Sequence, residues 1–216
     1  MVQIGHISTG ELWNVNKKRL LRYMRKFLPF LAVKETDKCI DMGEANPKME
    51  YIKNELRINV TQVSDIDFNF GTLDKYYGSA DVVFALEVLE HVQNPLWFMR
   101  EMKRCLKNNG SIYVTLPSNP KWLWVDGHYF EIPRKHFEKW IVEPLGLRIV
   151  RHKKITNRNI WRGLLIGYRP LMRVLRGHAH WKSLVREILY FKFDVYEIKR
   201  ADCLNCAFNH YENELK

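Results

Sequence analysis

The chain has 216 residues, of which 46% are hydrophobic, so it is long and apolar enough to form one globular domain with a sizeable core. Its formal net charge of +11 at neutral pH predicts an anionic partner, which would be a nucleic acid, an anionic membrane surface or an acidic substrate. No apolar run reaches the ~20 residues that cross a bilayer, and residues 1–10 lack the features of a signal peptide, so we expect a cytoplasmic protein.

Residues 11–32 are expected to form a helix, because apolar residues recur there at helical spacing with basic residues between them. Pro29 would end this helix. The basic side is either a solvated face, with the apolar side packed on the core, or a lid or membrane-facing surface.

The stretch from Lys38 to Pro47 has the pattern of a strand, a tight turn and a helix. Apolar residues lead into Asp41, Gly43 follows two positions later, and Pro47 suits the first position of a helix. In an open parallel sheet, ligands bind where such turns leave the carboxyl ends of the strands. Gly43 would let a ligand approach the backbone, and Asp41 offers a carboxylate to ligand hydroxyls or amines. The alternative is a purely structural turn.

A second strand is expected over residues 58–64, which are rich in β-branched side chains. Asp65 and Asp67 would then lie at or just past its carboxyl end, where nucleotide-binding sheets often hold a ribose. Two loop acids in a turn are the alternative interpretation.

The near-continuous apolar run from Ala80 to Leu86 predicts a buried parallel strand. A helix should follow, capped by Asn94 and running from Pro95 to Leu106. Gly110 is suited to a left-handed turn that would end this helix, and residues 111–116 alternate as another strand.

An aromatic loop over residues 121–133 comes next, followed by a short helix at 136–142 and a strand at 147–155. Residues 157–190 are amphipathic, with an apolar stripe opposite several arginines, and Pro170 would kink or split this helix. Residues 191–198 alternate as a last strand. A Cys-x-x-Cys pair, Cys203 and Cys206, would need more ligands than the nearby His210 to bind zinc.

The order of these features resembles the class I S-adenosylmethionine-dependent methyltransferases, and in particular the subgroup that includes the quinone-biosynthesis enzymes. The resemblance covers roughly residues 36–155, and its most specific part is 81–117, which contains the run Glu-Val-Leu-Glu-His-Val. Two features depart from the family. Its usual Gly-x-Gly-x-Gly turn is here Gly43-Glu-Ala-Asn46, and the short distance from Gly43 to Asp81 indicates that one strand-helix unit is missing.

The resemblance implies an α/β fold with a Rossmann-like, mostly parallel sheet, helices on both faces and an antiparallel last strand. The basic helical insertion would precede that strand. We expect a single domain over 1–216, with an N-terminal helix (1–35), a cofactor-binding core (36–155), the insertion (156–190) and the last strand and tail (191–216).

The resemblance also implies S-adenosylmethionine as the cofactor. It assigns Asp41, Gly43 and Glu44 to the turn at the methionine end of that cofactor. It places Asp65 or Asp67 at the ribose or adenine end, and Leu86 and Glu87 beside the cofactor.

Methyl transfer from a sulfonium requires an in-line approach in a desolvated pocket and sometimes a base, but no metal, so no metal site is predicted. The candidate bases are His91, His128 and Glu131. His128 lies in the aromatic loop, where this fold usually receives substrate, and histidine titrates near neutral pH. His91 is more typical of a hydrogen-bonding residue at the start of a helix.

Three functions are consistent with the sequence. The first is a methyltransferase acting on a small-molecule or lipid-linked acceptor, with peripheral contact to an anionic membrane. The second is a degenerate methyltransferase fold that acts as a binding module. The third is an RNA-directed methyltransferase or RNA binder, which the sequence favours less because it lacks an Asn-Pro-Pro-Tyr or Asp-Pro-Pro-Tyr motif. The mixture of basic and apolar residues also fits a membrane face better than a phosphate track. The oligomeric state is left open.

Overall fold

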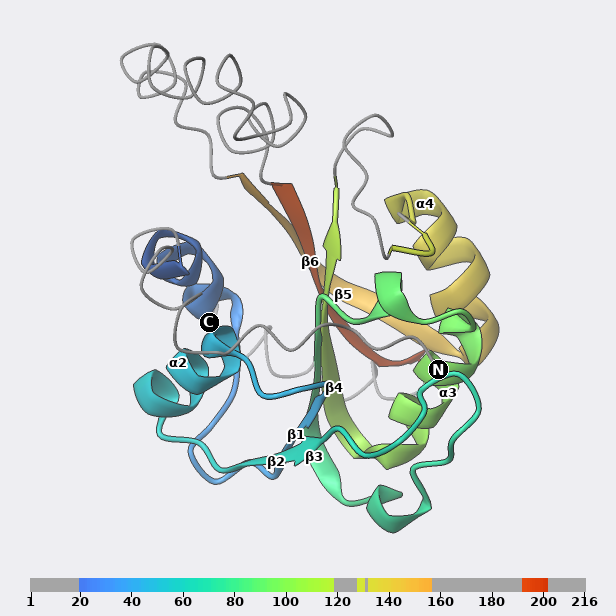
Figure 1. The fold of residues 1–216 in the computed structure, drawn as a ribbon, viewed down its shortest axis with the longest axis horizontal. Coiled ribbons are helices and arrows are strands. Elements are labelled where there is room, and N and C mark those ends of the chain that lie inside the picture. The colour runs from blue at the N-terminus through green and yellow to red at the C-terminus, as the bar shows by residue number, and fades with distance from the viewer. Residues whose placement is uncertain (1–19, 119–127, 131, 157–191, 202–216) are drawn as a thin grey trace, which may run out of the picture.

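The computed structural model describes residues 20–118, 128–130, 132–156 and 192–201. Six strands form one sheet in the order β2-β1-β3-β4-β6-β5, with helices on both of its faces (Figure 1). In chain order the strands and helices are β1 Cys39–Met42, α2 Pro47–Leu56, β2 Val60–Val63, β3 Ala80–Leu86, α3 Pro95–Cys105, β4 Leu106–Pro117, α4 Arg134–Phe137, β5 Leu147–Thr156 and β6 Lys192–Arg200. Residues 20–27 are also helical.

The sheet is mostly parallel, as predicted. Strand β1 pairs in parallel with β2 and β3, and β3 pairs in parallel with β4. The last strand, β6, runs antiparallel to both of its neighbours, β4 and β5. The resulting architecture is Rossmann-like, with an antiparallel last strand as predicted.

The predicted loss of one strand-helix unit agrees with the segment between β2 and β3. Residues 64–79 are all described, and their regular structure is one 3₁₀ turn, Asp74–Tyr76. Strand β2 is therefore the edge of the sheet, and the loop that carries Asp65 and Asp67 runs directly from it toward β3.

One face of the sheet is covered by the N-terminal helix and α2 (Figure 1). Apolar side chains of both helices pack against the sheet, and the amide of Ala32 donates a hydrogen bond of 3.0 Å to the Tyr113 hydroxyl in β4. The largest fully buried side chains on this side are Met24, Phe27, Met49, Ile52, Phe84 and Tyr113.

The other face is covered by α3 and by the helical segment that starts with α4 (Figure 1). This segment continues as a π-helical turn, Glu138–Val142, and a 3₁₀ turn, Glu143–Leu145, close to the predicted short helix at 136–142. The buried side chains here include Phe98, Met99, Met102, Phe137, Val142 and Tyr196.

Local signals explain where α2 and α3 begin. The Asn46 side chain accepts hydrogen bonds from the amides of Lys48 and Met49, and that of Asn94 accepts one from Trp97. A proline follows each asparagine at the first helical position. Both predicted helix starts are confirmed.

The predicted role of Gly110 is wrong. Helix α3 ends at Cys105, and Gly110 lies inside β4 rather than in a left-handed turn. A Cβ at this position would lie 3.0 Å from the Asp81 carbonyl oxygen and 3.1 Å from that of Ala80. Glycine is needed here because β3 and β4 approach closely where their register shifts.

The amphipathic insertion predicted at 157–190 lies outside the described residues, as do Cys203 and Cys206. In the part of the chain that the structure describes, no helix has the length and apolar character needed to span a membrane.

Candidate functional site

The turn after β1 is held in place by a glutamine from the neighbouring strand. Gln62 lies opposite Asp41 in the register of β1 and β2. Its amide nitrogen donates a hydrogen bond of 3.0 Å to Asp41 Oδ2 and another to the carbonyl oxygen of Gly43. Gln62 therefore fixes both the acid and the glycine of the predicted cofactor turn, although the sequence analysis had not identified it.

Asp41 is buried, and its second carboxylate oxygen, Oδ1, has no hydrogen-bond partner among the described residues. Burial raises the pKa of Asp41 to about 7, although the hydrogen bond from Gln62 acts in the opposite direction. A buried carboxylate oxygen without a donor is costly, and native structures rarely keep one without a reason. Asp41 is thus placed to accept a hydrogen bond from a cationic or hydroxyl-bearing ligand.

Gly43 has a φ of +124°, a conformation that side-chain-bearing residues rarely adopt. Its amide donates a hydrogen bond of 2.9 Å to the Val63 carbonyl oxygen at the end of β2. A Cβ here would lie 3.3 Å from Val88 Cγ2, so the turn after β1 lies against the loop after β3. Glu44, next in the turn, is exposed.

Leu86 is buried at the end of β3, and Glu87 follows it with a φ of +60°. The Glu87 amide donates a hydrogen bond of 2.9 Å to the Thr115 hydroxyl in β4. Glu87 Oε2 forms an ion pair with Lys48 at the start of α2, whereas Oε1 is buried without a hydrogen-bond partner among the described residues. Neither Lys48 nor this pairing was evident from the sequence, because the two residues lie on separate elements.

Tyr23 brings the N-terminal helix to the same region. Burial, and then the negative charge of Glu87, raise the pKa of its phenol, while a hydrogen bond with Thr115 acts in the opposite direction. Lys48 Nζ lies 5.5 Å from the centre of the Tyr23 ring and 5.4 Å from that of Phe193. The β3 loop is therefore enclosed on this side by an aromatic and basic wall.

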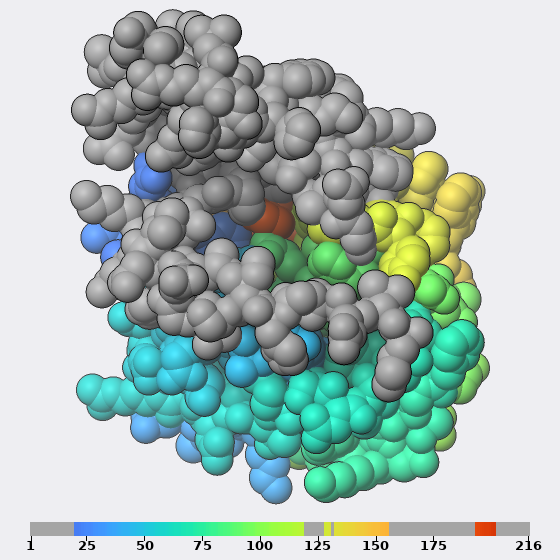
Figure 2. All heavy atoms as spheres, in the orientation of Figure 1, coloured from blue at the N-terminus to red at the C-terminus, as the bar shows by residue number. Residues whose placement is uncertain are grey.

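Asp65 and Asp67 lie just beyond β2 and are both exposed. The segment between β2 and β3, teal in Figure 2, lies at the surface of the molecule. Asp67 Oδ1 accepts hydrogen bonds from the backbone and side-chain nitrogens of Asn69, at 2.9 and 3.0 Å. Asp65 Oδ1 accepts one of 3.1 Å from the Ser64 hydroxyl. Asp67 thus stabilises its own loop, which leaves Asp65 as the better candidate for a ribose contact.

His91 and His128, far apart in sequence, lie together beyond the carboxyl ends of β3 and β4. Their ring centroids are 4.7 Å apart and nearly perpendicular, at 86°. The buried carboxylate of Glu90 joins them, and the ligand atoms of all three residues lie within 4.8 Å of one another. Glu90 was not predicted, and the third candidate base, Glu131, lies outside the described residues.

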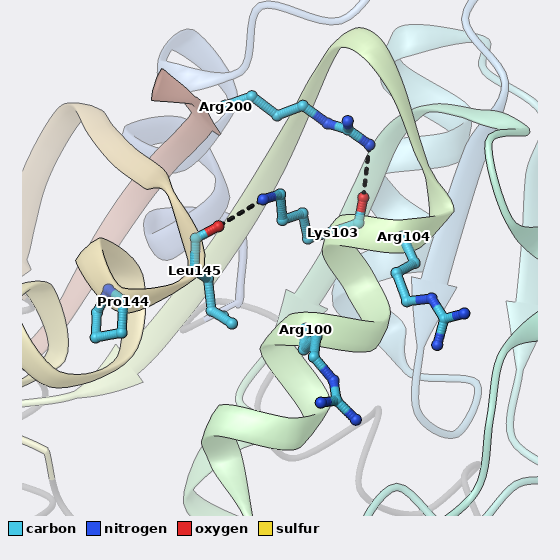
Figure 3. A pocket seen from close by; sticks show the side chains of 6 residues that line it. All are labelled: Arg100, Lys103, Arg104, Pro144, Leu145 and Arg200. Carbon is cyan, nitrogen blue, oxygen red and sulfur yellow. Dashed lines mark hydrogen bonds between the residues drawn. The ribbon is translucent and has the colours of Figure 1, made fainter. Parts of the chain in front are cut away.

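A hollow with basic walls lies at the opposite end of the sheet, where β4 and β5 begin (Figure 3). Lys103 Nζ donates a hydrogen bond of 2.6 Å to the Leu145 carbonyl oxygen, and Arg200 donates to the carbonyl oxygens of Lys103 and Leu106. Cations are favoured at the carboxyl end of a helix, here α3, so these side chains have a structural role. The residues that line the hollow are Arg100, Lys103, Arg104, Pro144, Leu145 and Arg200.

Comparison with known proteins gives a family match and a set of fold relatives. Residues 39–114 match the methyltransferase domain family. No curated protein matches the chain. An S-adenosylmethionine-dependent methyltransferase from Archaeoglobus fulgidus has 14% sequence identity and a TM-score of 0.58, with 87% of this chain and 99% of that chain covered.

Two other solved structures show how widely this fold is used. Phosphoethanolamine N-methyltransferase 2 of Haemonchus contortus, in complex with phosphomonomethylethanolamine and S-adenosylhomocysteine, has 12% identity and a TM-score of 0.55, with 85% of this chain covered. This chain spans only 53% of that enzyme's length. The [4+2]-cyclase SpnF has 13% identity and a TM-score of 0.52, with 83% of this chain and 80% of that chain covered.

These matches support the predicted enzyme class and the predicted cofactor. They do not distinguish a subgroup. The chain therefore has a Rossmann-like methyltransferase fold, and its residues 39–114 match the methyltransferase domain family.

Proposed function

We propose that this protein is an S-adenosylmethionine-dependent methyltransferase that acts on a small-molecule or lipid-linked acceptor. The proposal rests on one observation: the turn after β1 and the turn after β3 are in contact at the carboxyl ends of these strands. Each turn holds a carboxylate oxygen, Asp41 Oδ1 and Glu87 Oε1, that is buried without a hydrogen-bond partner among the described residues.

The two carboxylates fit this cofactor better than they fit a phosphate-bearing one. S-adenosylmethionine carries an ammonium group, ribose hydroxyls and a methyl group on a cationic sulfonium, which it supplies for transfer when bound. Asp41 and Glu87 would attract such a ligand and repel a pyrophosphate. The first free amides of α2 are already bonded to Asn46, so the usual phosphate site at a helix N-terminus is filled by the protein itself.

The altered glycine turn is compatible with this proposal. Within this turn, position 43 has a φ of +124°, which residues with a side chain rarely adopt, and it is still a glycine. Asn46 has a separate role as the N-cap of α2. Glu44 is exposed beside Gly43, where it would border the methionine end of the cofactor. The Glu-Val-Leu-Glu-His-Val run at 87–92 supports placing the chain near the quinone-biosynthesis methyltransferases.

The acceptor would approach from the side of His91 and His128, beyond the ends of β3 and β4. A neutral imidazole at either position would act as the base that takes the proton that an oxygen or nitrogen nucleophile loses on methylation. A membrane surface as partner is supported by the net charge of +11 and by the amphipathic pattern of residues 157–190. A cytoplasmic, peripheral location follows from the same proposal.

A binding experiment with the full chain tests the cofactor assignment. Calorimetry with S-adenosylmethionine and S-adenosylhomocysteine should give a micromolar dissociation constant. Gly43→Val should abolish binding, because its side chain would meet Val88 and enter the turn. Gly78→Val is the matched control, since Gly78 also has a positive φ of +64° but lies outside the site with nothing near its missing Cβ.

The absence of binding heat at millimolar ligand, with folded protein, would contradict the enzyme assignment and favour the binding-module function. The SpnF structure shows that the fold by itself does not decide between methyl transfer and other chemistry. Incubation of the protein with cell extract and radiolabelled cofactor should place the label in the lipid or small-molecule fraction. Label in the RNA fraction would instead support the RNA-directed alternative.

A further inference from the structure

Four basic side chains line the hollow at the opposite end of the sheet from the candidate cofactor turn. They are Arg100, Lys103 and Arg104 of α3 and Arg200 of β6, and none of the residues that line the hollow is acidic. The hollow holds about 590 Å³, which lies within the range of about 300–1,000 Å³ that is typical of small-molecule sites. We propose that it binds a phosphate group, carried by a small phosphorylated molecule or by a lipid headgroup.

Arg100 and Arg104 would be the main ligands of this phosphate. They lie one turn apart on α3, and Figure 3 shows both side chains extending to the same side of the helix. Arg100 Cζ lies 4.0 Å from the centre of the Trp97 ring. Arg104 Cζ lies 4.1 Å from the centre of the Tyr77 ring. Stacking holds each guanidinium by one face and leaves the N–H groups at its edge for phosphate oxygens, which guanidinium groups bind in pairs of hydrogen bonds.

The positive charge of the hollow is only partly balanced by the protein. Arg104 forms an ion pair of 3.3 Å with the buried Glu101, whereas Arg100 forms none with the described residues. The carboxyl end of α3 adds about half a negative charge, so an excess of about two positive charges remains. Like charges one turn apart on a helix repel each other. A phosphate dianion would neutralise this excess.

Lys103 and Arg200 fix the walls of the hollow. Lys103 Nζ donates to the Leu145 carbonyl oxygen, and Arg200 donates to those of Lys103 and Leu106, so α3, β6 and the turn Glu143–Leu145 are joined around it. An ammonium group has three N–H donors and a guanidinium has five, so both side chains keep donors that these bonds do not use. Arg200 Nε in particular is buried without an acceptor among the described residues, which a bound anion would supply.

A single phosphate-bearing ligand fits these contacts better than a nucleic acid does. A nucleic-acid strand is bound by a basic groove that follows several phosphates and by aromatic rings on which bases stack. Here the cations gather in one hollow, and the rings of Trp97 and Tyr77 are each stacked on a guanidinium. The proposal does not depend on the methyltransferase assignment. Because the hollow lies at the opposite end of the sheet from Asp41 and Glu87, a phosphate bound there takes no part in methyl transfer.

Binding is measured by calorimetric titration of the full chain with inorganic pyrophosphate, at low salt in a buffer without phosphate. A micromolar dissociation constant is expected. Arg100→Gln should weaken binding by about tenfold, and adding Arg104→Gln should weaken it by about a hundredfold, because each change removes a charge-assisted pair of hydrogen bonds. Arg100→Lys keeps the charge but loses the planar fork and its stacking, so it should still weaken binding several-fold.

A matched control removes the same charge outside the hollow. Arg25 in the N-terminal helix and Arg134 in α4 are exposed, and changing both to Gln should leave pyrophosphate affinity within about twofold of the parent, because exposed charges at a distance are screened. Urea unfolding without ligand checks that each variant is folded. Arg104→Gln leaves the buried Glu101 without its ion-pair partner, so Arg100→Gln is the variant that tests the site if the double variant is unfolded.

Vesicles distinguish the two sources of the phosphate. Phosphatidylcholine vesicles that contain phosphatidic acid present phosphomonoester headgroups, which are compared with phosphatidylserine vesicles of equal surface charge. If a lipid headgroup is the ligand, the protein should prefer phosphatidic acid, pyrophosphate should release it, and the variant with both Arg100→Gln and Arg104→Gln should lose the preference. Pyrophosphate binding without such a preference would assign the hollow to a soluble phosphorylated molecule.

The proposal is overturned if the folded parent binds neither pyrophosphate at millimolar concentration nor phosphatidic acid in preference to phosphatidylserine. It is also overturned if Arg100→Gln weakens binding no more than the control with Arg25→Gln and Arg134→Gln, because net charge and not the hollow would then attract the anion. Binding of single-stranded RNA that depends on Arg100, without any binding of pyrophosphate, would replace the phosphate site by a nucleic-acid surface.

Discussion

Lys48 at the start of α2 forms an ion pair with Glu87, the first residue after β3, and so joins two elements that each carry part of the candidate cofactor site. Both side chains are about three-quarters buried, with 23% and 27% of their surfaces exposed. Lys48 also lies over the rings of Tyr23 and Phe193, so one ammonium group links α2, the N-terminal helix and β6 to the loop after β3.

The first prediction concerns this pair. Lys48→Met should lower the free energy of unfolding by about 1.5–3 kcal/mol, because the largely buried Glu87 carboxylate would remain without its charged partner. Lys53→Met is the control, because Lys53 pairs with Glu50 at the surface and should cost less than about 1 kcal/mol. Urea unfolding gives both values. Adding Glu87→Gln to Lys48→Met should recover part of the loss, and no recovery would mean that the pair is not the source of the effect.

The second prediction follows from the pKa of Asp41, which burial raises from 3.8 to about 7. At a pH between these two pKa values, Asp41 is protonated in the folded chain and ionised in the unfolded chain. The free energy of unfolding should therefore decrease as the pH rises from 4 to 7. Asp41→Asn removes the ionisation while keeping the shape. Its unfolding free energy should fall less over this range than that of the parent.

At pH 8 the Asp41→Asn protein should therefore be more stable than the parent, by up to about 4 kcal/mol if the full difference is realised. It should nevertheless bind S-adenosylmethionine more weakly, because the carboxylate that faces the ligand is gone. A variant that gains stability and loses binding marks a site residue. Parallel losses of stability and binding would instead assign Asp41 a structural role.

The third prediction separates Asp65 from Asp67. Asp65→Ala should weaken cofactor binding by about tenfold or more, since a charge-assisted hydrogen bond is worth about 1.5–3 kcal/mol. Asp67→Ala should mainly loosen its own loop, because its carboxylate is bonded to Asn69. Calorimetric titration of both variants with S-adenosylmethionine measures the two affinities. Equal and unchanged affinities would show that the ribose is held elsewhere.

The fourth prediction concerns the amphipathic segment at 157–190, whose sequence places Arg169, Arg173 and Arg176 opposite an apolar stripe. Basic residues near an anionic membrane contribute about 1 kcal/mol each, so the protein should sediment with anionic vesicles at low salt and be released as salt rises. Changing the three arginines to Gln should reduce this binding.

A control for the fourth prediction removes the same charge elsewhere. Lys135, Lys139 and Arg148 are exposed, and changing them to Gln should leave vesicle binding nearly unchanged. Equal losses in the two triple variants would show that net charge, and not this segment, drives association. No sedimentation even at low salt would make the segment a substrate lid and a soluble acceptor the better assignment.

The sequence alone determined the elements whose causes are local. The Asn-Pro pairs at 46–47 and 94–95 place two helix starts, because capping and the fixed φ of proline act within a few residues. The near-continuous apolar run at 80–86 predicts β3 with its observed bounds. The short segment between the second and third strands likewise indicates the missing unit, since too few residues remain to form it.

The tertiary structure decided what depends on contacts between distant residues. Gln62 meets Asp41 through strand register, Lys48 meets Glu87 through the packing of α2, and Glu90 meets His128 because β3 and β4 end side by side. Gly110 was misread for the same reason: glycine permits both a left-handed turn and a close strand contact, and only the position of β3 shows which one is used. Local chemistry thus specified the elements, whereas the partners of each polar side chain followed from how the sheet brings its carboxyl ends together.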